Sequence, residues 1–182
     1  MGRTKAQKVV KVPCSQAGIR EAINHLHRYE SYIYRLNGEF VRRLAEEGFD
    51  IASIAIQSST NYDRDKPVGT LDILTDSTGA VSSCRLKFSG EQVMFIEFGA
   101  GFYYNTNSDI NNWAEQFGYG VGTYPNQVHA NDESGWSYQA DTGEWIHTMG
   151  TEATAPLFNA IQAIITKNRF AEIAREVYRS AF

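Results

Sequence analysis

A run of apolar residues with helical spacing occupies the first quarter of the chain and constrains the fold more than any other feature. After Ser15, a good helix cap, apolar side chains recur at steps of three and four residues: Ile19, Ile23, Leu26, Tyr29, Ile33, Leu36, Phe40, Val41 and Leu44. The pattern predicts an amphipathic helix to about Glu47, with a bend at Gly38 and an end at Gly48. Such a helix is about 48 Å long, more than one compact domain needs. We therefore expect part of it to pack outside its own domain.

The chain of 182 residues predicts one domain, residues 15–182, preceded by a basic flexible arm over residues 1–14. The arm carries Arg3, Lys5, Lys8 and Lys11, and its composition is not that of a signal peptide. No apolar run is long enough to cross a bilayer, so we expect no membrane association. The two cysteines, Cys14 and Cys84, are not spaced as a disulfide framework or a zinc site.

The middle of the chain has the composition of β-strands. The run IASIAI, residues 51–56, fits either a helix or a strand. Three further runs, GTLDILTD, AVSSCRLKF and EQVMFIEFG, are separated by turn residues and predict an antiparallel meander. The segment GWSYQADTGEWIHT then predicts a hairpin that places Trp136, Tyr138, Trp145 and His147 on a shared face.

Thr151 or Thr154 is expected to cap a closing helix, with Pro156 in its first turn. The predicted fold class is therefore α+β. It has a long N-terminal helix, a mainly antiparallel sheet of about four to six strands, a long loop at 99–134, and a C-terminal helix packed on the sheet.

The predicted loop begins at FIEFGAGFYYN, residues 95–105, where Gly99 and Gly101 allow the chain to leave the sheet sharply. It is rich in glycine and aromatic residues, and NNWAEQF fits one helical turn within it. Such composition suits recognition surfaces. Sugar binding, subunit contact and core filling are all compatible with it. The expected subunit interface comprises Phe98, Phe102, Tyr103, Tyr104, Trp113, Phe117, Tyr119 and Tyr124.

A catalytic constellation is harder to find. The residues to consider are Cys14, Cys84, His25, His27, His129, His147 and the carboxylates Glu97 and Glu144. No familiar spacing joins a nucleophile to a base, and two histidines two residues apart point in different directions on a helix. The glycine-rich GYGVG, residues 118–122, lacks the lysine and hydroxyl residue of a phosphate loop. We predict no catalytic, metal or cofactor-binding residues, and no enzyme.

Several segments together resemble the tail-component family of long-tailed double-stranded DNA phages, the neck and tail-completion proteins also found in prophages and phage-derived tail particles. The resemblance lies in FIEFGAGFYYN, in GYGVGTYPN, in GWSYQADTGEWIHTMG, and in the junction GTEATAPLFNAIQAI before the closing helix. It implies a structural head-tail joining subunit. The subunit would form a ring, expected to be hexameric, between the head-tail connector and the tail tube or tail terminator protein. It would be assembled in the host bacterial cytoplasm and located in the virion.

The charge distribution adds an expectation to this resemblance. No lysine or arginine occurs from Phe88 to Thr166, although nine acidic residues do. Such a segment cannot grip phosphates. In a ring it would let DNA pass without binding, and the expected acidic lumen face comprises Asp109, Glu115, Asp132 and Glu133. Two alternatives remain open: a carbohydrate- or peptide-binding module that uses the aromatic loop, and a Cys/His hydrolase.

Overall fold

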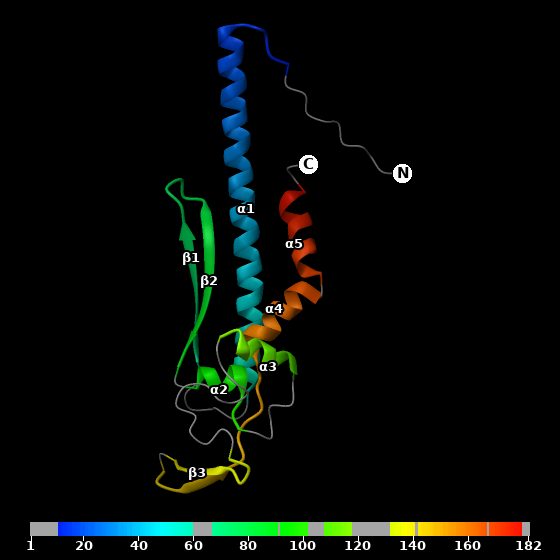
Figure 1. Ribbon diagram of the computed structural model, residues 1–182. Coiled ribbons are helices and arrows are strands. Elements are labelled where there is room, and N and C mark those ends of the chain that lie inside the picture. The colour runs from blue at the N-terminus through cyan, green and yellow to red at the C-terminus, as the bar shows by residue number, and fades with distance from the viewer. Residues whose placement is uncertain are drawn as a thin grey trace.

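The fold is organised around one long helix (Figure 1). The computed structural model describes residues 11–59, 67–90, 92–101, 108–117, 132–140, 142–166 and 168–179. It contains a long N-terminal helix, two small antiparallel sheets of two strands each, and C-terminal helices. The predicted α+β class is confirmed, but two separate hairpins replace the expected sheet of four to six strands.

Helix α1, Gln16–Ser58, begins as predicted, because the Ser15 side chain accepts a hydrogen bond of 3.1 Å from the Gly18 N–H. It does not end at Gly48. The helix continues through the ambiguous IASIAI run and ends at Ser59, whose hydroxyl donates to the Ile56 carbonyl. Gly48 is buried, and a Cβ there would lie 3.3 Å from Ile164 Cδ1. This glycine therefore makes room for a neighbouring helix instead of ending its own.

The first hairpin joins β1, Val68–Thr75, to β2, Val81–Ser89, and lies along α1 (Figure 1). Leu71 pairs with Leu86 and Ile73 with Cys84, so these four side chains share one face, whereas Val68 and Leu74 lie on the other face and are exposed. Gly38 of α1 fits closely against the start of β2. A Cβ at this position would lie 2.9 Å from the Val81 carbonyl oxygen, so Gly38 serves close packing of the hairpin on the helix.

The prediction of a third strand is wrong. Residues Val93–Phe98 form the short helix α2, and the meander stops at two strands. Gly99 ends α2 with a φ of 72°, and its N–H donates to the Phe95 carbonyl. Ala100 then pairs with Thr151 through two backbone hydrogen bonds of 2.8 Å. Within the predicted loop, Ser108–Glu115 forms helix α3, longer than the single turn expected.

The second hairpin, β3 at Trp136–Gln139 and β4 at Trp145–Thr148, occurs where the sequence predicts it. Its register corrects the predicted shared face. Trp136 and Tyr138 pair with Thr148 and Ile146, whereas Trp145 and His147 pair with Gln139 and Ser137 on the opposite face. A one-residue difference in register moves a side chain to the other side of a hairpin, and the loop between the strands sets that register.

The C-terminal region forms two helices and packs mainly on α1, not on a sheet. Helix α4, Pro156–Thr166, begins at the predicted proline, and α5, Arg169–Tyr178, follows after Asn168, which has a left-handed φ of 57°. Ion pairs join α5 to α1: Arg169 Nε lies 2.7 Å from Glu47, and Arg43 lies 3.3 Å from Glu176. The single closing helix that the sequence predicts is therefore broken into two.

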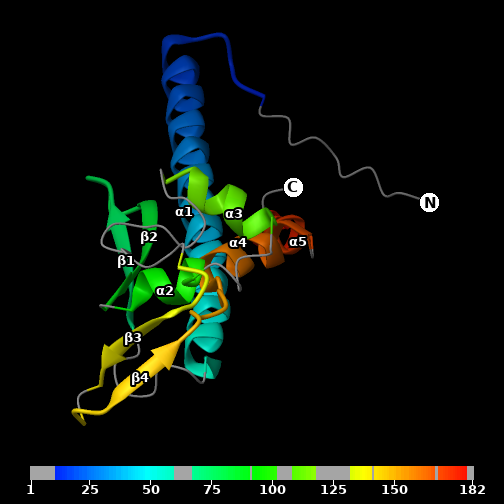
Figure 2. The same ribbon diagram turned by 60° about the horizontal axis from the view of Figure 1, so that its bottom comes forward.

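Two parts of the molecule project from the rest (Figures 1 and 2). The N-terminal half of α1 extends beyond the other elements at one end, and the β3–β4 hairpin extends at the other. Among the described residues, the elements that pack on α1 are β1, β2, α4 and α5. The hairpin β3–β4 makes its main contacts within itself.

Candidate assembly surfaces

The N-terminal half of α1 presents large apolar side chains to solvent. Leu26 is 68% exposed, and the others that are at least two-fifths exposed here are Ile19, Ile23, Tyr29 and Tyr34. An open groove of about 590 Å³ runs along this segment and is lined by Leu26, His27, Tyr29, Glu30, Ile33, Tyr34 and Asn37. A helix with an apolar stripe normally buries it, so this stripe is a candidate contact surface.

Farther along α1, helix α5 covers the same side of the helix. Ile19, Leu26, Ile33 and Phe40 are seven residues apart and so lie along one side. Phe40 packs edge-on against Phe170 of α5, with ring centroids 5.0 Å apart. The Tyr178 hydroxyl, at the end of α5, donates to Asn37 at 2.6 Å. Helix α5 therefore covers this side of α1 up to about Asn37.

A second candidate region is the junction between α2 and α4, where Glu97 is 4% exposed. Its carboxylate accepts 3.0 Å hydrogen bonds from the backbone N–H groups of Leu157 and Phe158 and from Trp113 Nε1. The carbonyl of the preceding Ile96 accepts the N–H groups of Thr154 and Ala155. Two neighbouring residues thus satisfy the N–H groups at the start of α4, in place of the predicted threonine cap.

The junction brings two distant segments of the chain together: EFG, residues 97–99, supplies the carboxylate that caps the helix that TAPLF, residues 154–158, begins. Burial raises the pKa of Glu97, and the hydrogen bonds from Leu157, Phe158 and Trp113 oppose the rise. Because both carboxylate oxygens are occupied by donors from the chain, Glu97 is placed as a structural cap and not as an acid or base facing a substrate. Glu144, the other carboxylate considered, lies exposed in the turn before β4.

Three of the eight expected interface residues lie among the described residues, and the structure brings them together. Phe98 is 6% exposed and packs with Ala114, with Trp113 against the same cluster. Phe117 is 53% exposed, and its ring lies 4.9 Å from that of Trp113 and 6.0 Å from that of Phe98. Phe98 therefore fills the core of its own chain, whereas Phe117 retains surface for a partner. Outside the described residues lie Phe102, Tyr103, Tyr104, Tyr119 and Tyr124.

A shallow hollow of about 310 Å³ lies beside this cluster, between α3 and α4. It is lined by Asp109, Asn112, Trp113, Gln116, Phe158 and Gln162. Two aromatic rings and several amide and carboxylate groups face the same space. This combination offers both stacking and hydrogen bonding to a small polar ligand.

The projecting β3–β4 hairpin is the third candidate. Trp145 is 72% exposed on one face, while Tyr138, on the other face, is 48% exposed. On the Trp145 face, Ser137 Oγ lies 3.2 Å from His147 Nδ1, so the imidazole is held by its cross-strand neighbour. An isolated two-stranded hairpin is marginally stable in water, so exposed aromatic side chains here suit a contact that forms on assembly.

All four residues of the expected acidic face are exposed. Asp109 and Glu115 lie on α3, and Asp132 and Glu133 precede β3. Asp132 also accepts hydrogen bonds from the Ser134 N–H and hydroxyl, which fixes the turn into the hairpin. These positions belong to the end of the molecule opposite the projecting part of α1 (Figure 1).

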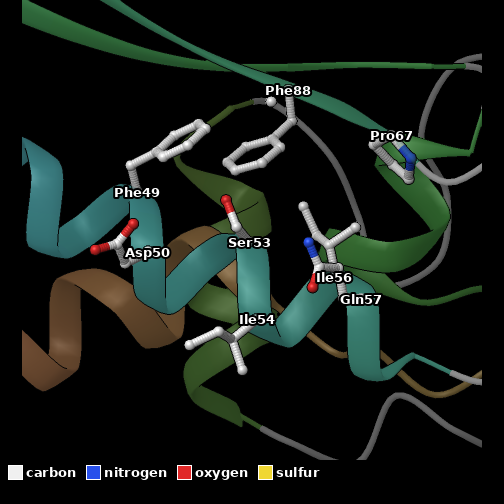
Figure 3. A pocket seen from close by; sticks show the side chains of 9 residues that line it. Phe49, Asp50, Ser53, Ile54, Ile56, Gln57, Pro67 and Phe88 are labelled. Atoms are coloured by element: carbon white, nitrogen blue, oxygen red, sulfur yellow. The ribbon is translucent and has the colours of Figure 1, made fainter.

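A hollow near the other end of α1 has a volume of about 580 Å³ and lies between that helix and the first hairpin (Figure 3). Phe49 and Phe88 stack at its rim, with ring centroids 5.8 Å apart. Among the described residues, the lining contains the carboxylate of Asp50 and the hydroxyl of Ser53, and neither histidine nor cysteine.

The remaining reactive side chains are not gathered into a site. Cys14 is exposed before α1, and Cys84 is half-buried in β2, where burial raises its thiol pKa. His25 and His27 are exposed on α1, and His129 lies outside the described residues. Within the described ranges, no three His, Cys, Asp or Glu side chains come together in a way that would hold a metal ion. Over the same ranges, no helix combines the length and apolar character of a membrane span.

Comparison with known proteins gives no relative for this chain: no protein-family model, curated protein or solved structure matches it.

Proposed function

We propose that the chain is a structural subunit of the neck or tail-completion ring of a long-tailed phage or of a phage-derived tail particle. Its partners would be other copies of itself, a head-tail connector protein, and a tail tube or tail terminator protein. The hexameric ring and the virion location that the sequence resemblance implies are part of this proposal, as is the absence of an enzymatic role.

The observation that carries the proposal is the pair of unpartnered apolar surfaces at opposite ends of the molecule. Exposed Leu26 and its neighbours lie on the projecting half of α1, and Trp145 lies on the projecting hairpin. A subunit that touches different neighbours above and below needs two such surfaces, and buried aromatic anchors dominate the energy of such contacts.

The charge distribution supports passage of DNA at one end. The elements α2, α3, β3, β4 and α4 fall within the segment that contains no lysine or arginine, and the carboxylates Asp109, Glu115, Asp132 and Glu133 are exposed there. If this end lines the channel, the repulsion between carboxylates and phosphates keeps DNA from adhering to the wall. A map of the assembled ring with arginine and lysine side chains at its narrowest point would contradict the arrangement.

Deletion of the gene in a producing phage or prophage tests the function directly. We expect separate heads and tails by negative-stain microscopy, with few joined particles. Complementation should succeed with the parent chain and with Gln139→Ser, and fail with Trp145→Ser. Gln139 is the matched control because it pairs with Trp145 on the same face of the hairpin. Normal joined particles in the deletion strain would exclude the proposed function.

Glycan binding is the second candidate, favoured by the hollow beside Trp113. Its lining of two aromatic rings, two glutamines, one asparagine and one aspartate suits a sugar ring with several hydroxyls. A panel of bacterial cell-wall and surface oligosaccharides should then change tryptophan fluorescence in a saturable manner, and Asn112→Ala should abolish the change. The same titration with Trp145→Ser controls for the exposed hairpin tryptophan. Absence of saturation with every oligosaccharide would remove this candidate.

A further inference from the structure

We propose that the N-terminal half of α1 pairs with the same segment of a second copy in antiparallel orientation. The paired segment, residues 19–30, is about 18 Å long at 1.5 Å per residue. The inference does not rest on the phage function, because it follows from the surface of the isolated chain. It names a second copy as the occupant of one of the two exposed apolar surfaces described above.

The spacing of the apolar residues fits a two-helix seam. Ile19, Ile23, Leu26 and Ile33 follow alternating steps of four, three and seven residues, the pattern of the core positions of a coiled coil. Glu30 occupies the one remaining core position of the segment. Helix α5 already packs on the continuation of this seam, where Phe40 meets Phe170 and Glu47 meets Arg169. The covered part of this seam therefore packs against an antiparallel helix, α5, and the arginine of that helix, Arg169, pairs with the acidic residue of the seam, Glu47.

Charge complementarity selects a second copy and its direction. In an antiparallel pair with Ile23 facing Leu26 of the partner copy, Glu30 faces Ile19 of that copy and lies beside its Arg20. The pairing occurs twice by symmetry. In a parallel pair, Glu30 would face Glu30, and two carboxylates would repel each other inside an apolar seam. Within its own chain, Glu30 Oε2 lies 3.5 Å from His27 Nδ1, and both side chains are more than half exposed.

The contact is expected to be weak. Each copy contributes three exposed apolar core side chains, Ile19, Ile23 and Leu26, from a segment shorter than the roughly 20 to 30 residues a side of a standard stable interface. We therefore expect a dissociation constant on the order of micromolar or above. A two-fold contact closes on itself and leaves the β3–β4 hairpin free to meet other neighbours.

Analytical ultracentrifugation of the full chain, from roughly 1 to 500 µM, tests the pairing. We expect a reversible monomer–dimer equilibrium, and at least a tenfold weaker dimer for Leu26→Glu. Asn24→Glu is the matched control, because it adds the same charge to the opposite side of the helix and should leave the equilibrium unchanged. Circular dichroism of each variant verifies that the helix content is retained.

A charge exchange tests the orientation. Arg20→Glu and Glu30→Arg should each weaken the dimer, and the double variant should restore it, since each end of the pair again joins opposite charges. A chain that stays monomeric over the whole concentration range overturns the proposal, and so does a dimer that Leu26→Glu leaves intact. If both single variants weaken the dimer but the double variant does not restore it, antiparallel pairing with a second copy is also wrong.

Discussion

At the level of single residues, Glu97 determines most of the local structure around the aromatic cluster. Its carboxylate joins α2, α3 and α4 by accepting from Leu157, Phe158 and Trp113. A buried group with three donors is costly to replace, because a substituent that cannot accept from all of them leaves N–H groups unsatisfied.

Glu97→Gln should therefore lower the free energy of unfolding by about 1 to 3 kcal/mol. The amide retains one oxygen, but its NH2 group faces the N–H groups of α4. Chemical denaturation measures the effect. Glu115→Gln, on the exposed surface of α3, is the control and should change stability by no more than about 0.5 kcal/mol. Equal stability of the two variants would show that the Glu97 cap contributes little.

A second prediction at the level of single residues concerns the stability of the fold at low pH. The hydrogen bond from Arg169 lowers the pKa of Glu47 below its ordinary value of 4.5. Because the folded-state pKa is lower than the unfolded-state value, the contribution of this pair is complete above pH 4.5 and is lost as the pH falls through the folded-state pKa. The docking of α5 on α1 should therefore weaken in acid.

Glu47→Gln should remove the part of the pH dependence of stability that this pair causes, measured by urea denaturation at several pH values below neutrality. Glu144→Gln, an exposed residue outside any ion pair in the described residues, is the control and should keep the parent profile. If the free energy of unfolding of Glu47→Gln falls with decreasing pH as steeply as that of the parent chain, the pair does not have this role.

At the level of elements, two glycines in α1 illustrate opposite consequences of close packing. A Cβ at Gly38 would meet the Val81 backbone at 2.9 Å, whereas a Cβ at Gly48 would meet only the end of the Ile164 side chain at 3.3 Å. Alanine in a helix is favoured over glycine by about 1 kcal/mol, so the sign of each substitution depends on whether the neighbour can move.

Gly38→Ala should destabilise the fold by about 1 to 2 kcal/mol, because displacement of the β1–β2 hairpin costs more than the gain in helix propensity. Gly48→Ala should be neutral or stabilise it by up to about 1 kcal/mol, because Ile164 can shift its terminal methyl group. Thermal denaturation of both variants compares them directly. If both substitutions change the stability in the same direction, helix propensity and not the packing of neighbours determines their effect.

The sequence predicts some elements well and others poorly, for physical reasons. The Ser15 cap, the β1–β2 hairpin and the β3–β4 hairpin depend on local patterns, and they are confirmed. The run 93–98 is apolar at nearly every position, so its period does not separate strand from helix. Its helix depends on a tertiary contact, the Glu97 cap on α4, which no local pattern reveals. The available signals were Gly99, a helix-ending residue, and the i,i+4 pair Met94 and Phe98.

The candidate site was predictable only in part for the same reason. The excess length of α1 is visible in the sequence, and its exposed stripe follows from it. The burial of Phe98 and the capping role of Glu97 require contacts across 16 to 61 residues of chain. Composition identified the aromatic segment but did not separate the side chains that fill the core from those left exposed, such as Phe117.

At the level of the whole molecule, α1 is a shared axis whose two halves have different roles. The half after Asn37 carries the packed elements, while the half before it projects alone (Figures 1 and 2). The fold of the body therefore does not depend on the projecting half.

A chain that begins at Ser31, which supplies a new helix cap, should keep its body folded. We expect a cooperative thermal transition within a few degrees of that of the parent chain and a loss of helical signal proportional to the residues removed. The same chain should lose the dimer that forms through α1, because Leu26 and its neighbours are absent. Loss of the cooperative transition would show that the projecting segment contributes to the core.

The α2–α4 junction also has a consequence for how such chains diverge. Ile96 and Glu97 hold the start of α4 directly, and among the described residues between Gly101 and Thr151 it is Trp113 that reaches this junction, through its hydrogen bond to Glu97 and its ring contact with Phe158. Natural insertions and deletions in this interval that leave Trp113 in place should be tolerated while the junction stays fixed. In a set of descendants of this sequence, we expect loss of the acid at position 97 to be accompanied by changes around Pro156, although the two positions are far apart in the gene.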